Sequence, residues 1–417
     1  MTALLATGDP LLAGEIDGGV ILLVLLKTLI VFAIPLVLTA LMIWVERKVH
    51  GDMSNRIGPN RAGPWGILQT LADGAKLFTK EGLIPERADR LVYRLAPYLS
   101  AVPAFLVFAV VPFGGDFNPR SDGTIDGTVT LLGNATFLQL FDAQPGILLV
   151  LVCSSVAVYG VMLAGWSSGS KYPLLGSVRA TAQMVSYEAA LGLSLVAVVL
   201  VSGSLSTHDI VAFQALPGRG LLPNWNLIVT GVVPFFVFFI AATAEMNRPP
   251  FDLTEAEQEL VAGFNTEYSA IRFALFYIAE FMATITFGAV IATLFLGGPA
   301  GPDLGILPGW LWGTVWFFLK LAIFPFIWIW FRATLPRFRY DQLMDLGWKL
   351  MIPLSLGWIL LLAAIRSADT VGTDGQRIGY LPAVYVGAGV LLAAVLLQAS
   401  ITVGRRRREL ADLEVFD

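Results

Sequence analysis

Histidine and cysteine, the side chains that most often bind transition metals, are almost missing from this chain of 417 residues. The single cysteine, Cys153, cannot form an internal disulfide or hold an iron–sulfur cluster, and the two histidines, His50 and His208, lie far apart in the sequence. We therefore expect that the chain binds no metal, haem or cluster. We interpret Cys153 as a packed thiol inside a helix, and we expect both histidines to be solvated or to cap helix ends.

Charged residues are also scarce, because they make up 14% of the chain against roughly 25% of an average soluble domain. Hydrophobic residues make up 56% and the mean hydropathy is +0.73, which excludes an ordinary soluble protein. A helix needs about 20 apolar residues to cross roughly 30 Å of hydrocarbon. Nine such stretches lie near 20–44, 95–113, 146–166, 181–202, 226–244, 270–296, 310–331, 349–366 and 380–403. The predicted fold class is an all-α, polytopic membrane protein of about nine transmembrane helices.

Motifs of self-contained catalysis are missing as well. No glycine-rich phosphate loop follows a strand pattern, no zinc-ligand spacing occurs, and two histidines give no credible serine–histidine–acid triad. We therefore predict that no residue of this chain is directly catalytic. The first apolar stretch follows an acidic leader without a basic region or a cleavage pattern, so we expect a retained helix and no signal peptide.

Lysine and arginine are unevenly spread between the loops, and short loops rich in them mark the cytoplasmic side of a membrane protein. Segment 45–94 has nine of these residues, whereas 114–145 has only Arg120. The later loops continue the alternation, down to the run Arg405 to Arg408 after the last apolar stretch. We therefore predict an external N-terminus and a cytoplasmic C-terminus.

The first basic loop contains a helical pattern that is too short and too polar to span a membrane. In 64–80 an apolar row recurs at three- and four-residue steps opposite a polar row: Trp65, Leu68, Ala72, Ala75 and Phe78 against Gln69, Asp73, Lys76 and Lys80. We predict an interfacial amphipathic helix, for which a simple surface anchor is the plainer alternative. Glycine and proline in 57–66, and the pair Pro249–Pro250, indicate shaped turns in structured cytoplasmic loops.

Ionisable side chains inside apolar helices cost free energy, so each one is a hypothesis of function. Glu188 and Glu280 lie about eight and ten residues into their predicted helices, too deep to reach water easily, with a structural carboxyl as the alternative. Lys27 is a candidate for a proton relay, but its long side chain can reach the external surface, and we favour that interpretation. Arg332 and Arg337 end the seventh stretch, where an interface anchor and a contact with polar substrate are equally open.

Seven acidic residues within 36 positions form the densest signal in the sequence: Glu245, Asp252, Glu255, Glu257, Glu259, Glu267 and Glu280. Neighbouring carboxylates in a partly dry site cannot all ionise together, so their pKa values rise and they titrate as a coupled set. Such a set can carry protons near neutral pH. A solvated acidic loop is the alternative, but Phe251, Leu253 and Phe264 interrupt the run and favour a folded, partly buried segment.

Long and uncommon motifs follow one another along the chain: Glu46-Arg47-Lys48, RIGPNRAGP at 56–64, and the segments 72–81, 171–188, 244–253, 255–269 and 332–342. In this order they resemble the H subunit, or subunit 1, of respiratory complex I, the proton-pumping NADH:quinone oxidoreductase. The resemblance covers roughly 20–366. It implies a membrane protein that has no redox cofactor, is inactive alone, and encloses a quinone chamber together with peripheral subunits.

The resemblance also implies roles for individual residues. Positions that face the chamber or the peripheral arm are Arg56, Arg61, Trp65, Asp73, Arg248, Phe251 and Arg332. A proton relay would use Glu245, Asp252, Glu255, Glu257, Glu259 and Glu267 in an acidic funnel, and then Glu188 and Glu280. Quinone is the implied substrate, and FMN and iron–sulfur clusters belong to partner subunits. Further implied partners are small membrane subunits, antiporter-like subunits and membrane lipid, and no nucleic acid.

The expected layout places this chain in the bacterial plasma membrane. It consists of an external leader at 1–19, an eight-helix domain at 20–366, an external loop with an additional helix at 367–403, and a charged cytoplasmic tail at 404–417. The additional helix departs from the eight that the family commonly has, and its role is open. Thr254 also departs from the family, which often has proline or another small residue there.

Two other functions compete with this interpretation. The equivalent subunit of a membrane-bound hydrogenase shares much of the architecture without using quinone, and a nickel–iron rather than a flavin-bearing input module would identify it. A free-standing cation/proton antiporter would use the acidic residues as its transport path. It predicts paired half-repeats with broken helices, which the sequence does not show.

Overall fold

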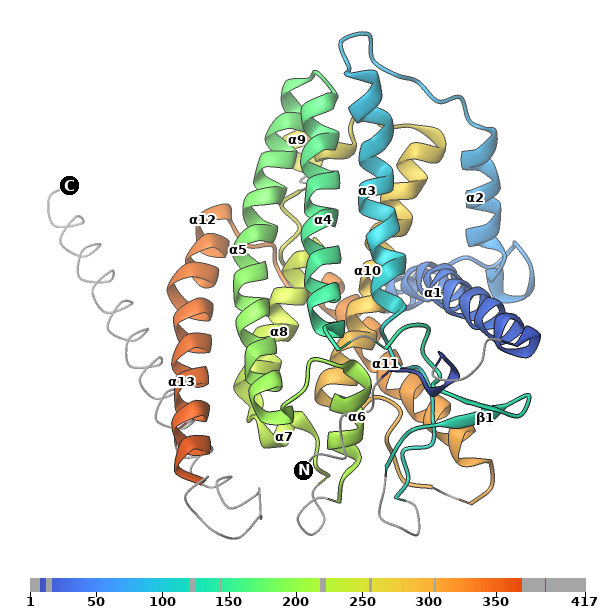
Figure 1. The fold of residues 1–417 in the computed structure, drawn as a ribbon. Helices are drawn as coiled ribbons and strands as arrows, with labels where there is room; N and C mark the ends of the chain where they lie inside the picture. Colours follow the sequence, from blue (N-terminus) through green and yellow to red (C-terminus); the bar gives the residue numbers. More distant parts are fainter. Residues whose placement is uncertain are drawn as a thin grey trace, which may run out of the picture.

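The computed structural model describes residues 8–12, 17–119, 125–142, 144–217, 223–254, 257–303, 305–369 and 387. Seven helices are long and apolar enough to cross a membrane: α1 (Gly18–Met53), α3 (Arg90–Phe108), α4 (Gly146–Ser167), α5 (Lys171–Ser202), α10 (Ala270–Phe295), α11 (Gly309–Thr334) and the continuous unit Tyr340–Arg366. The predicted all-α, polytopic membrane fold is confirmed (Figure 1). The ninth predicted stretch, 380–403, lies outside the described residues apart from Gly387.

The fifth predicted span, 226–244, is divided into two helices, α7 (Asn226–Val229) and α8 (Val232–Glu245). The break falls at Gly231, whose φ of 77° is readily adopted only by glycine. Because α8 has 14 residues, it is about 21 Å long at 1.5 Å per residue and falls short of the hydrocarbon thickness. The prediction of one uninterrupted helix was therefore wrong here.

The eighth predicted span, 349–366, is the end of a longer unit. It begins with α12 (Tyr340–Asp345), continues through a π-helical turn at Leu346–Met351, and ends with α13 (Ile352–Asp369). The α5 helix is also longer than predicted, because it begins at Lys171 rather than near 181. Glu188 consequently lies near the middle of a 32-residue helix rather than eight residues from its start.

The α10 helix forms the centre of the bundle. Of its apolar segment 83% is inside the protein, against 28% for α1 and 22% for Tyr340–Arg366. It packs against α1, α3 and α11, and aromatic rings of α8 and α11 complete the core around it, as in the stacked pair Phe239 and Trp328 at 5.6 Å. The α1 helix carries a long row of uncovered leucine, isoleucine and phenylalanine, and Tyr340–Arg366 exposes leucines and Trp348, as expected for helices that face lipid.

The two ends of the bundle differ. At one end, here called the hairpin face, lie η1 (Pro10–Leu12), the antiparallel strands β1 (Val129–Leu131) and β2 (Asn134–Thr136), and the helices α6 (Thr207–Ala215) and α7. At the other end, the loop face, lie η2 (Pro64–Gly66), α2 (Gln69–Thr79), α9 (Glu257–Leu260), η3 (Gly263–Asn265) and α12. Figure 1 shows α9 and the α2–α3 connection at the top and the hairpin with α6 and α7 at the bottom.

The predicted amphipathic helix at 64–80 is present as α2, but it begins at Gln69 after the turn η2. That turn needs glycine at 66, because φ is 77° and a Cβ atom would lie 2.3 Å from the carbonyl oxygen of Pro59. Asp73 and Thr70 of α2 face the protein, since Asp73 pairs with Arg47 of α1 and Thr70 donates to the carbonyl of Ala40. The apolar row is the exposed one, with Phe78 76% accessible.

Candidate functional site

Two adjacent serines of α4 hold two buried or half-buried carboxylates. Ser154 Oγ donates to Glu245 Oε1 at 2.6 Å, and Ser155 Oγ donates to Glu188 Oε1. Successive residues of a helix point about 100° apart, so neighbouring serines reach helices on two sides, α8 and α5. Glu245 and Glu188 have no cationic partner among the described residues. We call the two carboxylates, Glu188 and Glu245, together with the serines that bind them, the serine-held pair.

A cavity of about 100 Å³ lies beside the serine-held pair, between α3, α4, α5, α8 and α10. Its wall is largely apolar, and its polar groups include Ser154, Glu245 and Glu280. One water molecule needs about 10–15 Å³ of such space, so the cavity can hold several. The cavity therefore joins Glu245 and Glu280 through a volume in which water can pass a proton.

Glu280 also belongs to a second group of charges, the ion-paired cluster of Glu46, Arg248, Arg332 and Glu280. Arg248 Nη1 donates to both carboxylate oxygens of Glu46, at 3.0 and 3.2 Å, and its Nε lies 3.5 Å from Glu280 Oε1. Arg332 Nη1 binds Glu46 from the loop face. Glu46 and Arg248 are 5% and 4% exposed, so α1 and α10 are joined through a buried guanidinium.

The local fold after α8 explains how Arg248 reaches this position. The helix ends at Glu245, Asn247 takes a positive φ of 53°, and the N–H of Arg248 donates to the carbonyl of Thr243 at 3.3 Å. The chain thus turns back under its own helix end. A cis peptide bond joins Pro249 and Pro250 directly after it. The guanidinium lies 4.2 Å from the ring centre of Phe281, which adds a cation–π contact to its ion pairs.

Phe251, expected near the quinone chamber, is buried and joins the loop to two other elements. Its ring centre lies 5.5 Å from that of Tyr187 on α5 and 5.6 Å from that of Phe338. Tyr187 in turn donates to the carbonyl of Leu343 at 2.9 Å. The loop after α8, the centre of α5 and α12 are therefore packed together one residue away from Glu188.

The predicted acidic run is separated by the fold into an inner and an outer part. Glu245 and Glu280 line the cavity, whereas Asp252 pairs with Arg337 at 3.2 Å and Glu259 with Arg179 at 2.6 Å. The hydrogen bond and positive charge of Arg179 lower the pKa of Glu259, whose side chain is 60% exposed. Glu267 is half-buried on the loop face, and its backbone carbonyl accepts from Tyr93 Oη at 2.7 Å.

Two members of the predicted run cannot be placed: Glu255 and the side chain of Glu257 lie outside the described residues. The predicted chamber residues also fall into two groups. Arg56, Arg61 and Trp65 are exposed around α2, while Arg248 and Phe251 are buried under α8. Asp73 belongs to the first group. Burial raises its pKa, but the hydrogen bonds from Arg47 and Gln69 outweigh burial, and the net pKa is lowered.

Sequence reasoning missed several residues of these clusters. Glu46 was quoted within a motif without a role, although a carboxylate at the end of an apolar stretch was a usable signal. Lys320 was missed inside the stretch 310–331. It is 5% exposed and donates to three backbone carbonyls at 2.6–2.8 Å, those of Leu296, Gly298 and Ala300, just beyond the end of α10. Ser154 and Ser155 gave no signal, because serine is common in membrane helices.

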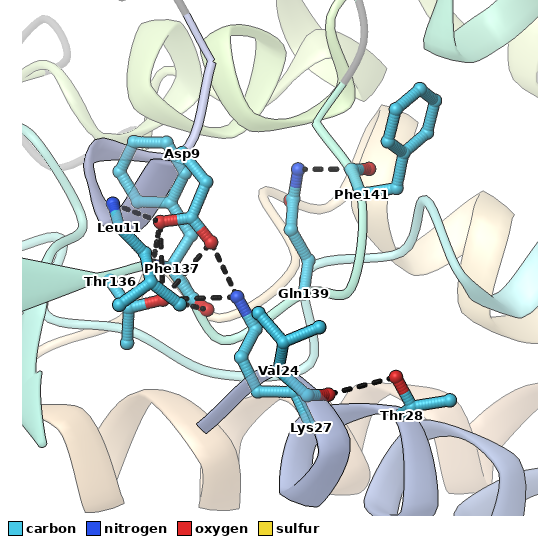
Figure 2. A network of polar contacts seen from close by, with 9 residues as sticks. All are labelled: Asp9, Leu11, Val24, Lys27, Thr28, Thr136, Phe137, Gln139 and Phe141. Atoms are coloured by element: carbon cyan, nitrogen blue, oxygen red, sulfur yellow. Dashed lines mark hydrogen bonds and ion pairs between the residues drawn. The ribbon is translucent and has the colours of Figure 1, made fainter. Parts of the chain in front are cut away.

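Three smaller expectations are settled by burial. Cys153 is buried and free, as expected for a packed thiol. Lys27 does not reach the surface as the favoured interpretation expected, because its side chain is 5% exposed and pairs with the buried Asp9 (Figure 2). His208 was expected to be solvated or to cap a helix, but it is 3% exposed inside the hairpin face, whereas His50 is exposed.

Comparisons with known proteins agree on one family. A family model described as NADH dehydrogenase matches residues 26–363. The chain is 48% identical to the H subunit of the NADH-quinone oxidoreductase of Frankia alni, over 99% of its own length and 86% of that protein. It is 48% identical to the same subunit of Frankia casuarinae, over 94% of the chain and 82% of that protein, and 45% identical to that of Streptomyces avermitilis, over 90% and 79%.

Proposed function

This chain belongs to the NADH dehydrogenase family, among the H subunits of NADH-quinone oxidoreductases, and from this premise we propose that it couples quinone reduction to proton movement through the serine-held pair and Glu280. It is a multi-pass bacterial membrane protein and a subunit of an oxidoreductase complex, and its partners are other subunits of complex I. Quinone is the substrate of that complex.

The observation that carries the proposal is the contrast in charge between the carboxylates in and beside one small cavity. Glu245 on the cavity wall and Glu188 beside it are held by serine hydroxyls and have no cation among the described residues, while Glu280 on the same cavity touches Arg248. A carboxylate without a cation in a poorly solvated site exchanges protons more readily than one in an ion pair. Glu280 therefore stands where a moving guanidinium would change its affinity for a proton.

The coupling step follows from the contacts of Arg248. A negative charge that appears in the quinone chamber attracts the guanidinium of Arg248 away from Glu280 and toward the chamber. A shift of the loop after α8 can likewise move it toward Glu46. Glu280 then takes a proton from the cavity water. The proton deficit passes to Glu245, whose hydrogen bond from Ser154 links it to α4, and to Glu188 beyond. Reversal of the charge in the chamber returns the guanidinium and expels the proton.

The quinone chamber is the second part of the proposal. The exposed group on the loop face, Arg56, Arg61 and Trp65 with the paired Asp73, offers cations and an uncovered apolar row beside α2. We propose that peripheral subunits close this surface into a chamber that Arg248, Phe251 and Arg332 border from inside. Electrons come from FMN and iron–sulfur clusters in those subunits. The loop face is cytoplasmic in this arrangement and the hairpin face is external, in agreement with the basic residues of 45–94.

Neutral isosteres of the buried carboxylates test the relay. Glu188→Gln and Glu280→Gln should leave the complex assembled, because amides keep the hydrogen bonds with the serine and the arginine side. Quinone-linked turnover and proton pumping should fall about a hundredfold, the usual scale for a lost proton-transfer group. Glu86→Gln, an exposed carboxylate on the loop face, is the matched control. Electron transfer from NADH to a soluble artificial acceptor shows that the input module is intact, and normal coupled turnover in both variants would refute the relay.

A further inference from the structure

A polar cluster on the hairpin face has no part in the function proposed above. Lys27 of α1 is paired with Asp9, and their side chains are 5% and 6% exposed (Figure 2). Thr136 of β2 lies between them, since Lys27 Nζ donates to Thr136 Oγ1 at 3.0 Å and Thr136 Oγ1 donates to Asp9 Oδ2 at 3.0 Å. One carboxylate therefore fastens η1, the hairpin and α1 together.

The side chain of His208 is packed against the same assembly. Phe137 directly follows Thr136, and its ring is stacked on the imidazole with centres 3.8 Å apart, while Phe117 lies at 5.3 Å. A Cβ atom at Gly127 would lie 2.7 Å from His208 Nε2, so the chain before β1 also closes over the ring. Within the described residues neither ring nitrogen makes a hydrogen bond of good geometry, although the backbone of Asp126 lies close enough to favour the protonated ring. A buried polar group in this state requires an explanation.

Acidic residues surround the imidazole from three different segments. Asp142 precedes α4, Asp126 precedes β1 and Asp9 belongs to the segment of η1, and the negative charge of each favours protonation of His208. Burial acts more strongly and lowers the pKa of His208. The other charged groups nearby are Lys27, already paired with Asp9, and Asp209 of α6, which accepts from Ser204 Oγ at 2.9 Å. In the closed structure burial therefore favours the neutral imidazole, although the carboxylates around it would stabilise the protonated form.

We propose that His208 is a proton-binding site of the hairpin face, and that a proton bound there releases the cap formed by residues 8–12 and 129–137. Protonation adds a second N–H donor and one positive charge to a ring that makes no well-formed hydrogen bond in the described part of the closed state. Phe137 and the Gly127 segment lie against the ring and keep water away from it. Asp9 and the hairpin must move for the imidazolium to gain water or a carboxylate oxygen.

The direction and size of the effect follow from linkage. The pKa of His208 is lowered in the closed state and returns to about 6.5 when the cap opens, so the open state binds more protons as pH falls below 6.5. Closed-cap stability is complete above that pH and declines below it. Between pH of about 7.5 and about 5.5 the opening constant should rise because of this one group, by at most about tenfold.

Asp209 must be separated from this effect, because burial raises its pKa to about 6 and its titration acts in the opposite direction. A comparison of two proteins that differ only at His208 removes it. We therefore expect the ratio of opening constants, wild type over His208→Gln, to increase between pH of about 7.5 and about 5.5, by at most about tenfold. Hydrogen–deuterium exchange of the intact complex, followed by mass spectrometry of peptides from 129–137, measures this ratio.

The chain provides its own control, because the only other histidine, His50, is exposed on the loop face. The opening constant of His50→Gln divided by that of His208→Gln should change with pH in the same way as the wild-type ratio. His208→Asn is the second neutral variant, used if His208→Gln does not assemble. A ratio that stays constant with pH for an assembled neutral variant would overturn the proposal.

The regulatory consequence rests on the proposed function, since it needs the hairpin face to be external. In proteoliposomes supplied with NADH from outside, internal acid then meets the hairpin face. The turnover of the wild type should decline with internal acid more steeply than that of His208→Gln at equal membrane potential. An equal decline would overturn regulation by external acid. A difference that appears only with acid on the NADH side would contradict the proposed orientation and support the proton site.

Discussion

The two groups of charges beside the cavity differ in what holds their carboxylates. In the ion-paired cluster, two carboxylates, Glu46 and Glu280, meet two guanidinium groups, Arg248 and Arg332. In the serine-held pair, two carboxylates meet hydroxyl groups and no described cation. The two groups share one cavity, with Glu280 on one wall and Glu245 on another.

This difference separates fixed charge from exchangeable charge. A buried ion pair holds both partners ionised, because neutralising one leaves the other unpaired in a poor solvent. A carboxylate held only by a hydroxyl can be protonated without leaving a buried charge behind. The same bundle therefore contains a set of paired charges and a site where protons can move, and Glu280 is where the first acts on the second.

Removal of the central cation should have the largest effect. Arg248→Met leaves Glu46 and Glu280 without their shared partner, and breaking a buried pair costs about 3–5 kcal/mol. We expect the amount of assembled complex in the membrane to fall sharply, as measured by native gels. Arg339→Met, an exposed arginine on the loop face, should assemble normally. If Arg248 acts by pairing, adding Glu46→Gln to Arg248→Met should restore part of the assembly, and no restoration would argue against this pairing.

Loss of a single serine hydroxyl should have an intermediate effect and leave assembly unchanged. Ser154→Ala removes the hydrogen bond to Glu245, and a bond to a charged group contributes about 1.5–3 kcal/mol. If that bond positions Glu245 in the relay, quinone-linked turnover should decrease about tenfold. Ser100 also lines the cavity but has no hydrogen-bond partner in the described part of the chain, so Ser100→Ala is the matched control. Equal turnover in the two variants would remove the serine-held pair from the relay.

Much of the arrangement was predictable because its physical cause is local. Long apolar stretches predict helices that cross the membrane, and carboxylates such as Glu188 and Glu280 are conspicuous inside them. The division of the acidic run was not predictable, because Asp252 and Glu245 are seven positions apart and the sequence does not say which one turns inward. The turn at Asn247 and the ion pairs with Arg179 and Arg337 determine which carboxylates lie inside. Both arginines come from distant parts of the chain.

The burial of the two lysines, Lys27 and Lys320, was even harder to predict from the sequence. Lys27 and Lys320 have side chains long enough to reach water from many places in a membrane helix, so their burial depends on tertiary partners alone. Lys27 finds Asp9, and Lys320 finds three carbonyls beyond the end of α10. The helix break at Gly231 belongs to the same class, since glycine tolerates both a continuous and an interrupted helix.

The only cysteine of the chain offers the mildest test of the comparison, because it changes no charge. Cys153 precedes Ser154 and lines the cavity, although the thiol is buried. If water occupies the cavity, a small neutral thiol reagent should modify Cys153 slowly in the native complex, while a bulky maleimide should not. Mass spectrometry of this chain distinguishes Cys153 from thiols of partner subunits. Cys153→Ala should retain turnover, since the thiol makes no ion pair. Failure of the small reagent to react before unfolding would mean a dry cavity, and protons could not then pass between Glu280 and the serine-held pair through water.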